Sequence, residues 1–174
     1  MLASTRRFLL VLACATGLVA ATPGSAGAAL EWRTGESSWN NPHARTPKVV
    51  GLRFARHQGF DRVVVDISGR RPGYQTLFAD KLYYDPSARP VPLKGRFKMY
   101  LVLRPAATYS MDGADLDDGP VLERPDFRSL KGIALTGSWE GDTSFGFTSR
   151  TRPYRVFTLT DPSRVVVDFR HPAG

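Results

Sequence analysis

The chain has 174 residues, hydrophobic residues make up 42% of it, and its formal net charge is +8. This length suits a single domain built around one hydrophobic core. The Lys and Arg residues are scattered singly rather than gathered in a run, so the positive charge does not predict nucleic-acid binding.

Residues 1–28 have the three parts of a signal peptide: a basic start, an apolar run from Phe8 to Ala21, and small residues up to Ala28. The apolar run is short for a bilayer span, which needs about 20 residues. We therefore expect cleavage after Ala28 and no transmembrane helix in the mature chain. Two alternatives stay open, because the Arg6-Arg7 pair resembles a twin-arginine export signal and Cys14 lies in a loose lipoprotein box.

Removal of the signal peptide would change which interactions can stabilise the domain, and export would determine which partners it meets. Cys14 is the only cysteine, so the mature chain forms no disulfide and must be stabilised by burial. Loss of the signal peptide lowers the net charge from +8 to +6. Outside the cytoplasm, cell-wall polymers and membrane surfaces attract a positive domain, although the charge also serves solubility. We expect a monomer that is secreted or associated with the cell envelope.

Residues 29–47 are polar and aperiodic, which predicts an irregular leader to a domain spanning 48–172. Trp32 and Trp39 interrupt this leader, either as anchors of a strap or as ligand-stacking platforms. Beyond it, short β-rich runs alternate with turn residues and no helical period is sustained. The pattern predicts an all-β sandwich of two packed, mainly antiparallel sheets. The eight expected strands are Val49–Arg56, Phe60–Ser68, Tyr74–Tyr83, Phe97–Arg104, Leu130–Thr136, Ser144–Ser149, Tyr154–Thr160 and Arg164–Arg170.

The pentapeptide Arg-Val-Val-Val-Asp occurs twice, at 62–66 and 164–168. Alternation along a strand sends one apolar set to the core and leaves Arg, Val and Asp outside. We expect the Arg and Asp residues to form exposed ion pairs, each contributing about 0–1 kcal/mol. The second copy also ends a hairpin that turns at 161–163. The expected core residues are Val63, Val65, Ile67, Val165, Val167 and Phe169.

Several segments resemble the AMIN-like domain of exported actinobacterial proteins, a relative of the AMIN domain: GFDRVVVDISG, RPGY, LKGIALTGSWEGDTSFGF and RPYRVFTLTDPSRVVVDFRH. The resemblance covers Val49 to His171, and its last segment is the most specific. It implies a β-sandwich that does no chemistry itself and binds or targets the cell envelope. AMIN domains are associated with peptidoglycan and with the division site.

Residues suited to catalysis are sparse. Ser138 lacks the glycine that a nucleophile elbow places two positions earlier. Glu123, Glu140 and Asp142 are the loop carboxylates from which a glycan hydrolase would need a close pair. We expect no enzyme activity.

Metal sites are equally poorly supported. His43, His57 and His171 are not spaced with further ligands as a zinc site requires. The acidic segment 112–119 lacks the spacing of an EF-hand, so we expect a solvated loop, with calcium binding as the alternative. We expect neither a metal nor a cofactor.

Binding is better supported, because aromatic and basic residues stand at turns, where a ring stacks on a sugar and Arg pairs with an anion. We predict a non-catalytic envelope domain that binds peptidoglycan or an associated anionic wall polymer. The alternatives are a protein-interaction module, with another envelope protein as partner, and a small glycan hydrolase. The candidate ligand-binding residues are Arg70, Arg71, Tyr74, Trp139, Arg150 and Arg152.

Overall fold

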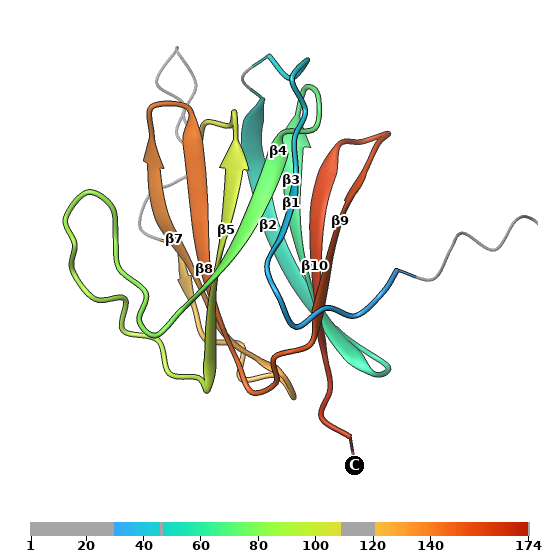
Figure 1. The fold of residues 1–174 in the computed structure, drawn as a ribbon, viewed down its shortest axis with the longest axis vertical. Coiled ribbons are helices and arrows are strands. Elements are labelled where there is room, and N and C mark those ends of the chain that lie inside the picture. Colours follow the sequence, from blue (N-terminus) through green and yellow to red (C-terminus); the bar gives the residue numbers. More distant parts are fainter. Residues whose placement is uncertain (1–29, 46, 109–120, 174) are drawn as a thin grey trace, which may run out of the picture.

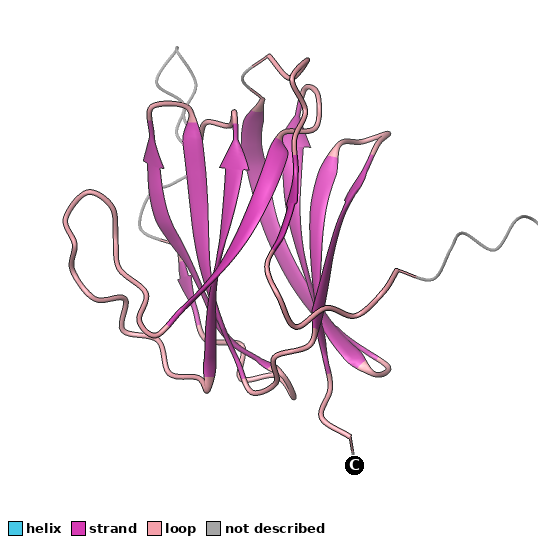
Figure 2. Cartoon of the chain, viewed as in Figure 1, coloured by secondary structure: helices cyan, strands magenta, loops and turns pink. Residues whose placement is uncertain are grey.

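The structure is a computed structural model that describes residues 30–45, 47–108 and 121–173. Within these ranges the chain contains strands and loops and no helix (Figures 1 and 2). The ten strands form two antiparallel sheets that face each other, which confirms the predicted all-β sandwich. The larger sheet has the order β1 (Ser37–Trp39), β4 (Gly73–Ala79), β5 (Phe97–Arg104), β8 (Asp142–Ser149), β7 (Leu130–Trp139), β6 (Leu122–Glu123), and the smaller has the order β2 (Lys48–His57), β3 (Phe60–Ser68), β10 (Arg164–Arg170), β9 (Tyr154–Leu159).

Strand positions agree closely with the sequence pattern. The bounds of β3, β5 and β10 are those predicted. β4 ends at Ala79 rather than Tyr83, while β7 continues to Trp139 and meets β8 in a tight turn. The two strands that were not predicted, β1 and β6, are three and two residues long, too short to show an alternating pattern.

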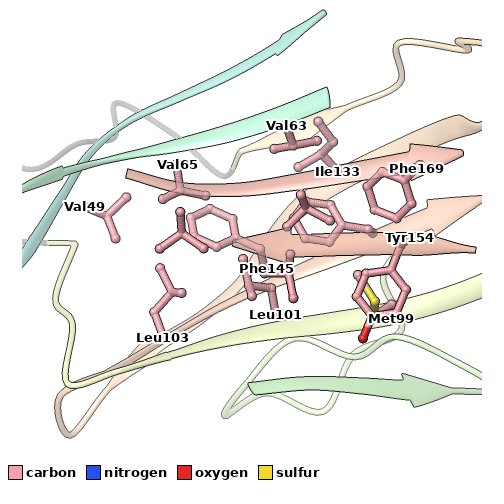
Figure 3. Close-up of a cluster of buried hydrophobic side chains, with 14 of the residues drawn as sticks. Val49, Val63, Val65, Met99, Leu101, Leu103, Ile133, Phe145, Tyr154 and Phe169 are labelled. Atoms are coloured by element: carbon pink, nitrogen blue, oxygen red, sulfur yellow. The ribbon is translucent and has the colours of Figure 1, made fainter. Parts of the chain in front are cut away.

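The main core lies between the sheets, and the doubled valine triplets form one wall of it. Val63 pairs with Val167 and Val65 with Val165 in the β3–β10 register, and all four side chains are fully buried. Phenylalanine and leucine side chains of the larger sheet pack against them (Figure 3). The expected inward face of both copies is thereby confirmed.

The outer faces of the two copies differ, which corrects one expectation. Asp66 forms the expected exposed pair, with Arg53 on β2. Asp168 is fully buried, receiving two hydrogen bonds from Arg62 and one from Arg155 at 2.7–2.9 Å. The register explains the difference, because Asp168 lies between Arg62 and Arg155, whereas Asp66 has Arg164 opposite it on one side and only Gly51 on the other.

Val166 is also buried, although alternation assigned it to the outside. It lies on β10, between β3 and β9, where Val64 and Phe157 are its register partners. An apolar neighbour on each side explains how this outward-facing position becomes covered.

Residues 30–45 follow the open side of the sandwich and contain β1, where an irregular leader was expected. Arg33 exchanges backbone hydrogen bonds with Tyr154, and Ser37 pairs with Thr76 on β4. Trp32 packs against Phe60 with ring centroids 6.2 Å apart. This segment therefore fastens to both sheets.

The connection from β4 to β5 covers the outer face of the larger sheet with a second apolar cluster. Leu82, Val91 and Leu93 are buried there against Ala134 of β7. Gly132 makes room for this layer, since a Cβ at that position would lie 2.6 Å from Cδ2 of Leu93. β4 ends early because the chain leaves the sheet to form this layer.

Three expectations concern residues outside the described ranges: the signal peptide at 1–28, the lipid-bearing role of Cys14, and the acidic segment 112–119. Among the described residues, no helix is long and apolar enough to cross a membrane.

Candidate functional site

The six candidate binding residues divide between opposite ends of the sandwich. Arg70 and Arg71 lie in the β3–β4 loop, Tyr74 at the start of β4, and Trp139 at the end of β7. The register places these strand ends side by side, so the four residues share one end. Arg150 and Arg152 lie between β8 and β9, at the other end.

A cleft of about 470 Å³ opens at the first end, between the β3–β4 loop, the end of β1 and the β9–β10 turn. We call it the Trp39 cleft. It combines two arginines, an indole, an amide and one carboxylate. Its lining residues are Trp39, Asn41, Ile67, Gly69, Arg70, Arg71, Thr160, Asp161, Pro162 and Ser163.

Arg71 is held in position by three contacts. Its Nη1 donates a hydrogen bond to Oγ1 of Thr158 at 2.9 Å, and its guanidinium lies 5.2 Å from the ring centroid of Trp39. Nδ2 of Asn41 donates to its backbone oxygen at 2.7 Å. The guanidinium is thus oriented before any ligand arrives, which lowers the entropy cost of binding.

The positive charge of this cleft is not neutralised within the described residues. Neither Arg70 nor Arg71 forms an ion pair there. Asp161 also lines the cleft and pairs with neither arginine. Unpaired guanidinium groups beside an aromatic ring are suited to carboxylate or phosphate groups carried on a sugar.

The two aromatic candidates at this end play different parts. Tyr74 points inward, packs against the main core and contacts Trp39, with ring centroids 6.4 Å apart. Trp139 is 66% exposed, beside a turn in which Glu140 and Gly141 have positive φ. Tyr74 therefore closes the end of the sandwich, and Trp139 offers a free ring.

An ion pair lies between these aromatic residues along the strand ends. Arg104 on β5 donates two hydrogen bonds to the carboxylate of Asp142 on β8. The hydrogen bonds, and then the charge of Asp142, raise the pKa of the Arg104 guanidinium above its ordinary value. Across this end of the larger sheet, Trp39 on β1 comes first, the Arg104–Asp142 pair follows, and Trp139 on β7 comes last. At the usual strand spacing β1 and β7 are about 19 Å apart.

A family model for the AMIN-like domain matches residues 47–171. The chain belongs to the AMIN-like domain family. No curated protein matches the chain. The match agrees with the resemblance seen in the sequence and associates this AMIN-like domain with the cell envelope.

The histidines of the AMIN-like domain have separate surroundings. His57 stacks on Phe60 with ring centroids 4.8 Å apart, and His43 is exposed. His171 Nε2 lies 2.9 Å from Oδ1 of Asp61, a buried carboxylate whose other oxygen accepts backbone hydrogen bonds at the start of β7. In the described ranges, no three or more His, Cys, Asp or Glu side chains gather as a metal site would need.

Two of the three loop carboxylates of the AMIN-like domain lie at one turn, and the third lies apart from them. Glu140 and Asp142 belong to the β7–β8 turn, and Arg104 holds Asp142. Glu123 is on β6. Its register partner is Ile133, which lies in the half of β7 that is farther from the β7–β8 turn.

Sequence reasoning did not assign Asn41 and the β9–β10 turn to the site, because they lie far in the chain from Arg71. Trp39 was noticed, but its place in the polar leader left two roles open. In the structure Trp39 packs on Tyr74, as an anchor of the strap would, and it also lines the cleft.

Proposed function

We propose that this AMIN-like domain is a non-catalytic module that holds an anionic cell-wall polymer in the Trp39 cleft. The observation that carries the proposal is the juxtaposition of Arg70 and Arg71, unpaired among the described residues, with the ring of Trp39. Arg71 binds a carboxylate or phosphate, and Arg70 adds charge that draws the polymer in. Trp139 extends contact along the same end.

The experiment is co-sedimentation of the purified protein with peptidoglycan sacculi, with and without their attached anionic polymers. We expect the protein to pellet at low salt and to be released at high salt, because screening weakens exposed ionic contacts. The double variant Arg70→Gln/Arg71→Gln should bind at least about tenfold more weakly, since a hydrogen bond to a charged group is worth about 1.5–3 kcal/mol.

The matched control is Arg89→Gln/Arg128→Gln, which removes the same charge from exposed residues outside the cleft. If the control loses as much affinity as the cleft variant, general charge attraction replaces the cleft in the explanation. Sacculi stripped of anionic polymer distinguish the carboxylates of peptidoglycan from the polymer's own anions. Release of soluble fragments from labelled sacculi would refute the non-catalytic role.

One observation favours a second function, the docking of an envelope protein. β2 is an edge strand of its sheet in the described part of the chain, and Val50 on it is 51% exposed. An apolar pocket of about 220 Å³ lies beside this edge, with Leu52, Phe54 and Phe145 in its lining. An extended segment added to β2 would place a side chain there. A photo-crosslinker at position 50 tests this alternative. The docking function requires that it captures one defined partner protein and that Arg71→Gln does not change the binding of that partner.

A further inference from the structure

The end of the sandwich opposite the Trp39 cleft carries a second basic and aromatic cleft, of about 520 Å³. We call it the Arg152 cleft. It lies where β4 ends, β5 begins and the chain approaches β9. Its lining residues are Phe78, Ala79, Asp80, Arg96, Phe97, Lys98 and Arg152.

Arg152 is positioned as Arg71 is. Its Nε donates a hydrogen bond to the backbone oxygen of Thr34 at 2.7 Å, and its guanidinium lies 4.3 Å from the ring centroid of Phe78. Each cleft therefore has one arginine fixed over an aromatic ring by a single side-chain hydrogen bond.

Further cations surround this arginine. Arg96 lies over Phe97 at 5.3 Å, and Lys98 Nζ donates to the backbone oxygen of Gly95 at 3.3 Å. Arg150 follows Ser149, the register partner of Phe97, and so lies at the same end.

The nearby carboxylates do not balance these cations. Asp80 lines the cleft, and Glu36 accepts a hydrogen bond from the backbone nitrogen of Phe78 beside it. Among the described residues, neither carboxylate forms an ion pair with Arg96, Lys98 or Arg152. Positive charge is therefore in excess in this cleft as well.

We propose that the Arg152 cleft is a second binding site for the same class of anionic polymer, which makes one domain bivalent. The inference rests on the proposed function, because it assigns the same ligand chemistry to both clefts. β4 connects the two clefts, and its seven residues separate them by about 20 Å at the usual strand rise. With clefts at opposite ends, one molecule joins two polymer chains.

The test is a titration of isotope-labelled protein with a short glycerol-phosphate oligomer, followed by amide chemical shifts. The oligomer must be shorter than the separation of the clefts, so that one molecule cannot occupy both. We expect two separate groups of shifted amides, one around Arg71 and one around Lys98. Long poly(glycerol phosphate) should then be cross-linked by the protein and raise light scattering.

Paired variants assign each group of amides. Arg96→Gln/Lys98→Gln should weaken binding at the Arg152 cleft at least tenfold and leave the Kd of the Trp39 cleft unchanged, and it should abolish cross-linking. These two residues are chosen because Arg152 also fastens the N-terminal segment. Arg89→Gln/Arg128→Gln, outside both clefts, is the control for the loss of charge.

The outcomes separate the two proposals. If only amides around Arg71 shift in the parent protein, the second site is refuted and the proposed function stands. If only amides around Lys98 shift, the Trp39 cleft is refuted as the polymer site. If neither group shifts with this oligomer or with a soluble peptidoglycan fragment that carries carboxylates, both proposals fail.

Discussion

The two copies of Arg-Val-Val-Val-Asp allow a matched measurement of what burial does to an ion pair. We consider Asp168→Asn and Asp66→Asn, which make the same chemical change at equivalent positions. The side chain of Asp168 is fully buried between Arg62 and Arg155, which are 28% and 20% exposed. The side chain of Asp66 is 25% exposed and its partner Arg53 is 62% exposed.

The expected magnitudes follow from this difference in exposure. Removing one partner of a buried pair costs about 3–5 kcal/mol, because the remaining charge is left uncompensated. The arginines around Asp168 keep some contact with water, which lowers the expected cost of Asp168→Asn to about 2–4 kcal/mol. For Asp66→Asn we expect at most about 1 kcal/mol, as for surface pairs in general.

The assay is equilibrium unfolding in urea. With a slope of about 2 kcal/mol/M, Asp168→Asn should lower the midpoint by about 1–2 M and Asp66→Asn by at most about 0.5 M. Added salt should reduce the effect of Asp66→Asn more than that of Asp168→Asn, because screening acts mainly on exposed charges. Equal midpoints for the two variants would refute the reasoning from burial.

Three further predictions concern the core. Burial raises the pKa of the Tyr154 phenol in the folded protein. Above a pH of about 10 this phenol therefore ionises in the unfolded chain first, and the free energy of unfolding should fall as pH rises. Urea unfolding measured across that pH range should show a smaller fall for Tyr154→Phe. Gly132→Val places a side chain where Leu93 packs and should cost about 1–3 kcal/mol in thermal unfolding, whereas Gly35→Ala, with open space around it, should leave the unfolding temperature nearly unchanged. Phe147→Ala empties a fully buried position and should cost about 3–5 kcal/mol by urea unfolding; a loss below 1 kcal/mol would contradict its place in the core.

Much of the fold was predictable because strand alternation is a local property. The bounds of β3, β5 and β10 follow from their own residues, and so does the burial of Val63 and Val167. What alternation could not give is the set of neighbours across a strand. Asp66 and Asp168 end the same pentapeptide, yet Asp168 has an arginine opposite it on both sides, whereas Asp66 has an arginine on one side and a glycine on the other.

The candidate site was predictable in residue type and not in arrangement. Turn position and chemistry selected Arg71 and Arg152, both of which line clefts. The sequence gives no sign that these two lie at opposite ends, because that depends on the direction in which each strand runs. Tyr74 and Trp139 show the same limit, since only the folded structure distinguishes a ring that closes the sandwich from one that is free.

The pairing of β3 with β10 has a consequence for how this protein acquires its shape. Arg62 and Asp168, which meet across that pairing, are 106 positions apart in the chain. During synthesis the edge of β3 that pairs with β10 therefore stays unpaired until the chain has been made as far as β10. Contacts between such distant segments form slowly, and partially made chains with bare strands tend to aggregate. The smaller sheet of this domain is thus completed only after β10 has been synthesised.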